Sequence, residues 1–386
     1  MKKCAAGLAA LFLIVIFLSP RAFAAGYELP EGTSITAQSA YFVNLDTGIV
    51  VFEQNADEQR SVASLTKLMT ALLLMENVSD LENTKITAER SLYVPPITNP
   101  DSSTADIWPG ETVSALNMLY AMMLPSANEA AEAVGYYLGN GNLNNFYALM
   151  NARAAALGCT NTNFTSTNGL VDMDEGNYSS AHDIALMSRE LILNHPDIRT
   201  YTTIWMDTLR DGQFQLANTN KLIRFYEGAT GLKTGFTSEA GYCMSATAER
   251  DGMELIAVVL KSPTRDERNE SAKSLLSFGF ANYTLMDVYP NQALPPIDVL
   301  LGEQSQVQPV LAQSSRILVD KSQVNQVTTQ LRLCENVEAP VEQGQKLGEM
   351  AVLVDGQEQQ VIPIVADRAV DRLTVPGIFS RLLRTL

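Results

Sequence analysis

The segment at residues 61–75, SVASLTKLMTALLLM, is as apolar as a buried helix but contains a serine and a lysine. Ser64 and Lys67 stand three residues apart, so a helix would place the hydroxyl and the ammonium on one face. A serine hydroxyl is a weak nucleophile until a base takes its proton, and a lysine whose pKa is lowered by burial can be that base. The N-terminus of the helix would add backbone N–H dipoles beside the serine. The segment therefore predicts a serine nucleophile activated by a lysine.

A single S-x-x-K pattern is weak evidence, because it arises by chance in chains of this length and such a lysine more often extends to solvent. Two later segments strengthen the prediction. Ser126 and Asn128 lie in the stretch PSAN, at a predicted helix–helix junction, and Lys233-Thr234-Gly235 lies on a predicted strand. The elements S-x-x-K, S-x-N and K-T-G, in this order, are typical of a serine acyltransferase.

The first two thirds of the chain mix strand and helix signals, which predicts a domain of sheet and helices. Turn dipeptides between β-like runs predict two hairpins, and apolar residues at helical spacing predict helices. We expect hairpins at 36–54 and 241–261, an extended segment at 230–237, a helix pair at 113–138 split by Pro125, and helices at 144–157, 180–194 and 264–280.

The last third of the chain changes character after the prolines at 290, 295 and 296, which predict a linker. Residues 298–366 consist of short Val-rich runs separated by turns, a pattern that favours a small all-β domain. The final segment, VPGIFSRLLRTL, places its large apolar residues on one helical face and its arginines on the other. It has two interpretations, a helix that lies in a membrane interface or one that packs on the protein.

The first residues predict export. Lys2 and Lys3 precede an apolar run, and the AFA stretch at 22–24 has the pattern of a cleavage site, so we expect a signal peptide at 1–24 rather than an uncleaved anchor. The chain has a formal net charge of −16, which is unfavourable for nucleic-acid binding. Four cysteines and two histidines give neither a disulfide framework nor a histidine-rich zinc site.

The motifs in their context resemble the D-alanyl-D-alanine carboxypeptidases, which are low-molecular-mass penicillin-binding proteins of serine peptidase family S11. The resemblance covers about residues 30–285. It rests on four stretches: ASLTKLMTALL (63–73), MLPSANEAA (123–131), TNGLVDMDEGNYSSAHDIALMS (167–188) and GLKTGFTSEAGYCMSATAERDGMELIAVVL (231–260). The chain departs from the best-known members at Ala127, where a glycine is frequent.

This resemblance implies an α+β fold: a β-lactamase/transpeptidase-like domain with an antiparallel sheet and a helical block, then a small all-β domain and a C-terminal amphipathic helix. The expected divisions are a signal peptide (1–24), a penicillin-binding serine peptidase domain (25–286), a β domain (297–367) and a membrane-associating tail (376–386). The expected location is the outer face of the cytoplasmic membrane.

The resemblance also implies a role for each motif residue. Ser64 would form the acyl-enzyme, Lys67 would be its base, Ser126 would relay a proton, and Asn128 would position Lys67 and the substrate. The substrate-binding residues would be Lys233, Thr234, Gly235, Phe236 and Thr237. Lys233 supplies positive potential, the two threonines hold a carboxylate, and the N–H of Phe236 forms the oxyanion hole with that of Ser64.

The function that follows is removal of the terminal D-alanine from peptidoglycan pentapeptide stems, with β-lactams as covalent inhibitors and no metal or organic cofactor. Two alternatives stay open at this stage. One is a D,D-endopeptidase acting on crosslinked stems, and the other is a silent penicillin-binding module.

Two rival sites are disfavoured. The His182-Asp183 pair suggests a Ser-His-Asp triad, but the chain has no G-x-S-x-G elbow. The ELILN stretch from Glu190 resembles the deacylation element of class A β-lactamases. It lies far along the chain from Ser126, however, and its pattern indicates that Glu190 is an acid on the surface of a helix. Arg265 and Arg268 are possible extra cations, and the sequence assigns them no role.

Overall fold

The computed structural model describes residues 29, 35–89, 103–171, 173–210, 212–313, 315–375 and 377. The predicted signal peptide at 1–24 lies outside the described residues. So does the predicted tail at 376–386, apart from Gly377.

A five-stranded antiparallel sheet forms the centre of the first domain, in the order β2-β1-β9-β8-β7. Because side chains alternate along a strand, both faces of this sheet can be apolar and buried. On β9, for example, Ile256 and Val258 face one core and Leu255 and Ala257 face the other. The strands are β1 (Ser39–Asn44), β2 (Val50–Gln54), β7 (Ala229–Thr237), β8 (Gly241–Arg250) and β9 (Met253–Ser262).

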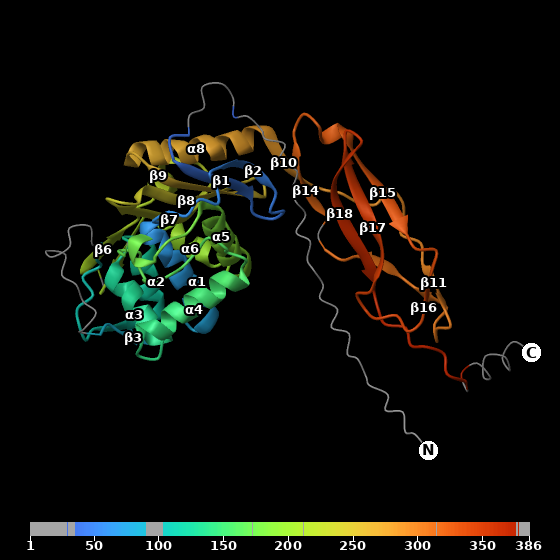
Figure 1. Cartoon of the computed structure of the whole chain (residues 1–386), viewed down its shortest axis with the longest axis horizontal. Helices are drawn as coiled ribbons and strands as arrows, with labels where there is room; N and C mark the ends of the chain where they lie inside the picture. Colours follow the sequence, from blue (N-terminus) through green and yellow to red (C-terminus); the bar gives the residue numbers. More distant parts are fainter. Residues whose placement is uncertain are drawn as a thin grey trace, which may run out of the picture.

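Helices cover both faces of the sheet (Figure 1). Helix α8 (Arg265–Asn282) lies along one face, where Gly279 allows close packing: a Cβ there would approach the Phe42 ring to 2.5 Å. The helical block lies on the other face, around the buried helix α1. The block contains α1 (Lys67–Asn77), α2 (Ala115–Met123), α3 (Asn128–Leu138), α4 (Leu143–Ala156), α5 (Ala181–Asn194) and α6 (Ile198–Thr202).

The predicted α+β class is confirmed, and the differences are local. Ser64 lies in a 3-10 turn, η1 (Ala63–Thr66), and the α-helix begins only at Lys67. Val113 and Ser114, predicted as helix, belong to strand β4 (Thr112–Ser114), which pairs with β3 (Lys85–Thr87). The sequence analysis did not anticipate α6, the hairpin of β5 (Met206–Leu209) and β6 (Phe214–Ala217), or the short helix α7 (Leu222–Phe225).

The second domain is built almost entirely of strands, as the Val-rich runs indicate. Its largest sheet has the order β13-β18-β17-β15, and smaller sheets are β12-β11-β16 and β10-β14. Strand β10, which directly follows α8, pairs with β14, so the chain passes between the domains through this ladder. The strands are β10 (Tyr283–Asp287), β11 (Ile297–Leu300), β12 (Gln306–Val307), β13 (Pro309–Leu311), β14 (Arg316–Asp320), β15 (Val327–Leu333), β16 (Asn336–Glu338), β17 (Lys346–Val354) and β18 (Gln357–Ala366).

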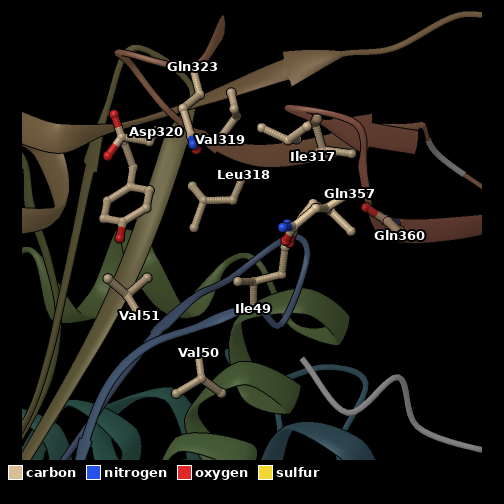
Figure 2. A pocket seen from close by; sticks show the side chains of 13 residues that line it. Ile49, Val50, Val51, Ile317, Leu318, Val319, Asp320, Gln323, Gln357 and Gln360 are labelled. Carbon is tan, nitrogen blue, oxygen red and sulfur yellow. The ribbon is translucent and has the colours of Figure 1, made fainter. Parts of the chain in front are cut away.

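A cavity of about 250 Å³ lies between the two domains. Figure 2 shows Ile49, Val50 and Val51 on the side of the first domain, with Ile317 and Leu318 of β14 among the residues opposite. Edge strand β2 of the five-stranded sheet thus faces the second domain across the cavity. In the part of the chain that the structure describes, no helix is long and apolar enough to span a membrane.

Candidate active site

The central feature of the site is the Lys67 side chain at the first position of α1. It is fully buried, and its Nζ donates to the Ser64 hydroxyl at 2.9 Å, to Asn128 Oδ1 at 2.7 Å and to the backbone carbonyl of Asn168 at 3.0 Å. An ammonium has three N–H donors, and these three acceptors match them. The turn η1 brings Ser64 to Lys67, so the predicted pairing is present although Ser64 precedes the α-helix.

Burial lowers the pKa of Lys67 from 10.5 to about 7, because removal from water disfavours the charged form. The carboxylates of Glu129 and Glu132 act in the opposite direction and raise it. Near neutral pH a substantial fraction of Lys67 is therefore the free amine, which can accept the proton of a serine hydroxyl.

Ser126 lies in the turn between α2 and α3, in a strained backbone conformation. Its φ is +71°, a left-handed value that is uncommon for a residue other than glycine. Backbone hydrogen bonds hold the turn: the N–H of Ala127 donates to Ala121 at 2.8 Å, and that of Asn128 donates to Ser103 at 2.9 Å. Ala127 itself has a negative φ, so the methyl group that replaces the frequent glycine requires no unusual backbone there.

Lys233 on β7 connects the third motif to the second. It is almost completely buried, and its Nζ donates to the Ser126 hydroxyl at 2.9 Å and to the Thr234 carbonyl at 2.8 Å. Burial holds the pKa of Lys233 well below its ordinary value, and the nearby charges of Lys67 and Arg268 lower it further. The structure therefore brings both lysines and both serines together.

Gly235 lets strand β7 lie directly against η1, the turn that contains Ser64. A Cβ at this position would be 2.9 Å from the Val62 carbonyl and 3.1 Å from the Ser64 nitrogen, both backbone atoms. The next residue, Phe236, is half-exposed, and its ring packs against that of Tyr242 with centroids 4.3 Å apart.

The two predicted threonines are placed differently. The Thr234 hydroxyl donates to Thr219 at 2.7 Å and lines the site cavity. Thr237 is buried, and its hydroxyl accepts the N–H of Ala240 at 3.0 Å. Among the described residues, the cavity lining includes Thr234 but not Thr237.

A cavity of about 290 Å³ opens over Ser64. Three cationic side chains line it, and Arg268 is the most buried, at 3% exposed. Its guanidinium donates twice to Asn269 Oδ1, and burial lowers the pKa of Arg268 to about 10. The lining residues are Ser64, Ser103, Ser126, Trp205, Asn218, Thr219, Lys221, Thr234, Gly235, Phe236, Tyr242, Arg265 and Arg268.

The sequence analysis missed the loop that closes the site behind Lys67. Asn168 supplies the carbonyl that binds the ammonium, and Gly169 follows with a φ of +82°. A Cβ on Gly169 would lie 1.9 Å from the Ala63 carbonyl, so this position requires glycine. The Asn-Gly pair in TNGL indicated a turn here but not its contact with Lys67.

The rival residues are engaged elsewhere. His182 pairs with Asp57 at 2.9 Å and stacks on Tyr41, and the Asp183 carboxylate accepts the Asn161 N–H at 2.8 Å. Glu190 pairs with Arg153 on the helical surface. Neither a Ser-His-Asp triad nor the lactamase element is therefore formed at Ser64.

A sheet with helices on both faces, and a serine bonded to a buried lysine beneath a cationic cavity, define a serine acyltransferase of the penicillin-binding class. The sequence profile of the D-alanyl-D-alanine carboxypeptidase family, Peptidase_S11, matches residues 26–264, and that of the C-terminal domain of penicillin-binding protein 5 matches residues 285–372. The chain belongs to the D-alanyl-D-alanine carboxypeptidase family.

Individual relatives agree with this assignment. The chain is 34% identical to the D-alanyl-D-alanine carboxypeptidase DacF of Bacillus subtilis, over 97% of this chain and 95% of the relative. Penicillin-binding protein 5 of Haemophilus influenzae superposes with a TM-score of 0.79 at 27% identity, covering 88% of this chain and 98% of the other. The DD-transpeptidase of Streptomyces K15 gives a TM-score of 0.60 at 30% identity, covering 64% of this chain and 98% of the other.

Replacing Gly235 with alanine tests the contact between β7 and the nucleophile turn. The added methyl group would meet two backbone atoms, so the strand must move away from Ser64, and we expect covalent labelling by a fluorescent penicillin to slow about 100-fold. Ala229→Gly is the control, because it also changes one methyl group on β7 but lies at the far end of the strand. Labelling of Gly235→Ala at the wild-type rate would show that this contact does not set the geometry of the site.

Proposed function

We propose that this chain removes the C-terminal D-alanine from peptidoglycan pentapeptide stems through an acyl-enzyme on Ser64. One observation carries the assignment of residues: the 2.9 Å hydrogen bond between Lys67 Nζ and the Ser64 hydroxyl, in a pocket where burial lowers the pKa of Lys67 to about 7. This pairs the nucleophile with a base that is partly deprotonated at neutral pH.

In the acylation step, the free amine of Lys67 takes the Ser64 proton while the serine oxygen attacks the carbonyl carbon of the penultimate D-alanine. The backbone N–H groups of Ser64 and Phe236 would stabilise the developing oxyanion, since Gly235 holds the two segments together. The C–N bond then breaks, and the proton that Lys67 took from Ser64 would pass through the hydroxyl of Ser126, which is bonded to Lys233, to the departing amine of D-alanine, so that Lys67 is again the free amine and Ser126 a hydroxyl. Water attacks the ester in the second step and releases the shortened peptide.

The cationic lining of the cavity supports a substrate that ends in a free carboxylate. Arg268, Arg265 and Lys221 line the same cavity as Ser64, together with the Thr234 hydroxyl. Such donors suit a carboxylate, and the buried guanidinium of Arg268 binds it in a medium of low dielectric constant. A β-lactam would acylate the same serine oxygen and leave slowly, because Glu190 is engaged with Arg153.

The direct test is D-alanine release from diacetyl-Lys-D-Ala-D-Ala by the wild-type protein and by Ser64→Ala. We expect release by the wild type and none by the variant, because the variant lacks the attacking oxygen. Release that persists in Ser64→Ala would remove Ser64 as the nucleophile. No release by the wild type, combined with cleavage of crosslinked stems, would favour the endopeptidase alternative.

The pKa of Lys67 predicts the pH dependence. Below about pH 7 the side chain is protonated and cannot accept a proton, so we expect the acylation rate to fall about tenfold per pH unit well below the pKa. Lys67→Ala should abolish this acylation at every pH while the circular dichroism spectrum stays unchanged. A wild-type rate that is constant through the acidic range would contradict the assignment of Lys67 as the base.

We further propose that residues 1–24 direct export and that the amphipathic tail at 376–386 holds the enzyme at a membrane surface. The support is the sequence pattern alone, a charged and apolar leader with a small-residue cleavage site and a tail with one apolar face. Cell fractionation of the full chain and of a chain ending at residue 375 tests both ideas. We expect both to be exported and only the full chain to sediment with membranes. Equal sedimentation would exclude the tail as the anchor.

A further inference from the structure

Two carboxylates, those of Glu129 and Glu132, act on Lys67, and Glu132 has no part in the mechanism above. Glu132 lies on α3 one turn after Asn128, so the two side chains share a helix face. Asn128 bonds directly to Lys67, whereas Glu132 accepts a hydrogen bond from the Asn168 side-chain amide at 3.0 Å. The Asn168 carbonyl in turn accepts from Lys67 at 3.0 Å, so one residue separates the carboxylate from the ammonium.

Asn168 is fixed at each of its polar groups, which makes it a rigid connection. Its Oδ1 accepts the Ser166 hydroxyl at 3.0 Å and the Leu170 N–H at 2.9 Å, and its amide nitrogen donates to Glu132. The following residue, Gly169, lies directly against η1. Any change at Glu132 therefore bears on the carbonyl that holds Lys67.

Glu132 also differs from its neighbour Glu129 in how its carboxylate is used. Glu129 accepts from the Thr104 hydroxyl at 2.7 Å and from the N–H groups of Ala105 at 2.7 Å and Ile107 at 3.3 Å, so it organises that loop. Both carboxylates act on Lys67 through their charge, whereas Glu132 is the one that accepts the hydrogen bond of Asn168.

The titratable and charged groups around Glu132 come from three helices: Lys67 on α1, Glu129 on α3 and Tyr147 on α4. Burial raises the pKa of Glu132 to about 7, with the Asn168 hydrogen bond and Lys67 opposing that rise. Lys67 and Glu132 thus change charge in the same pH range and must titrate as an interacting pair.

We propose that Glu132 is a positioning residue that sets the protonation of Lys67 through its negative charge and fixes the lysine through Asn168. This rests on the role of Lys67 as base proposed above. The charge favours the ammonium form and so delays formation of the free amine as the pH rises. The hydrogen bond keeps the Asn168 carbonyl aimed at Nζ.

Two variants separate the charge from the hydrogen bond. Glu132→Gln keeps an oxygen for the Asn168 amide but removes the charge, so the midpoint of the acidic limb of penicillin acylation should move to lower pH by up to about one unit with little change in the plateau rate. Well below pH 7 the two profiles should merge, because Glu132 of the wild type is neutral there too. Glu132→Ala removes both, so we expect the same shift together with a plateau about tenfold lower. Glu335→Gln, an exposed acid in the second domain, is the control and should leave the profile unchanged.

The outcomes distinguish this inference from the assignment of Lys67 itself. If Lys67→Ala is inactive but Glu132→Gln has the wild-type acidic limb, the role of Glu132 is overturned and that of Lys67 stands. An equal loss of rate at every pH in both Glu132 variants, without a shift, would also overturn it, because a merely structural contact would give that result. If Lys67→Ala still acylates, both proposals fail. Thermal unfolding measurements show whether each variant folds. If Glu132→Ala does not fold, the pH profile of Glu132→Gln alone decides the question.

Discussion

The site depends on a buried lysine held by uncharged oxygen atoms. Lys67 Nζ is bonded to a hydroxyl, a side-chain amide and a backbone carbonyl, and no carboxylate is among these acceptors. Removal from water without a directly bonded counter-ion shifts its pKa from 10.5 to about 7, which corresponds to about 5 kcal/mol in favour of the neutral amine. A lysine with this pKa can act at neutral pH as the base that we propose for Ser64, without a histidine.

The rest of the first domain shields Lys67 from water and holds the residues around it in place. Ser64 comes from the turn η1 just before α1, Asn128 from the start of α3, Lys233 from β7 and Asn168 from a loop. These segments are far apart in the sequence, and the sheet with helices on both faces fixes their mutual positions (Figure 1). Gly235 and Gly169 allow two of the segments to approach the turn more closely than any other residue would permit.

The sequence predicted the parts of the site that depend on local spacing. The spacing of three positions from Ser64 to Lys67, the Pro125 break before Asn128 and the extended K-T-G segment all define local geometry, so motif and element coincide. It did not predict Asn168, Thr219 or Glu132, because their contacts join residues 15 to 101 positions apart. Asn168 and Thr219 also lie outside helices and strands, where the sequence carries no periodic pattern. It also placed Ser64 inside a helix, since a 3-10 turn that leads into an α-helix has nearly the same apolar pattern.

The charge distribution shows how an acidic protein can recognise an acidic substrate. The whole chain carries a formal charge of −16, yet Lys221, Arg265 and Arg268 line the site cavity and Lys233 lies behind it. Surface charges are screened by salt over about 10 Å, whereas groups in a partly buried cavity interact through a medium of lower dielectric constant. The local cations therefore outweigh the net charge at the point where we propose that a carboxylate binds. Arg268 also helps to lower the pKa of the buried Lys233, because a positive charge nearby makes another less favourable. Arg268 thus lines the site cavity and acts on Lys233, whereas the carboxylates of Glu129 and Glu132 raise the pKa of Lys67 against the effect of its burial.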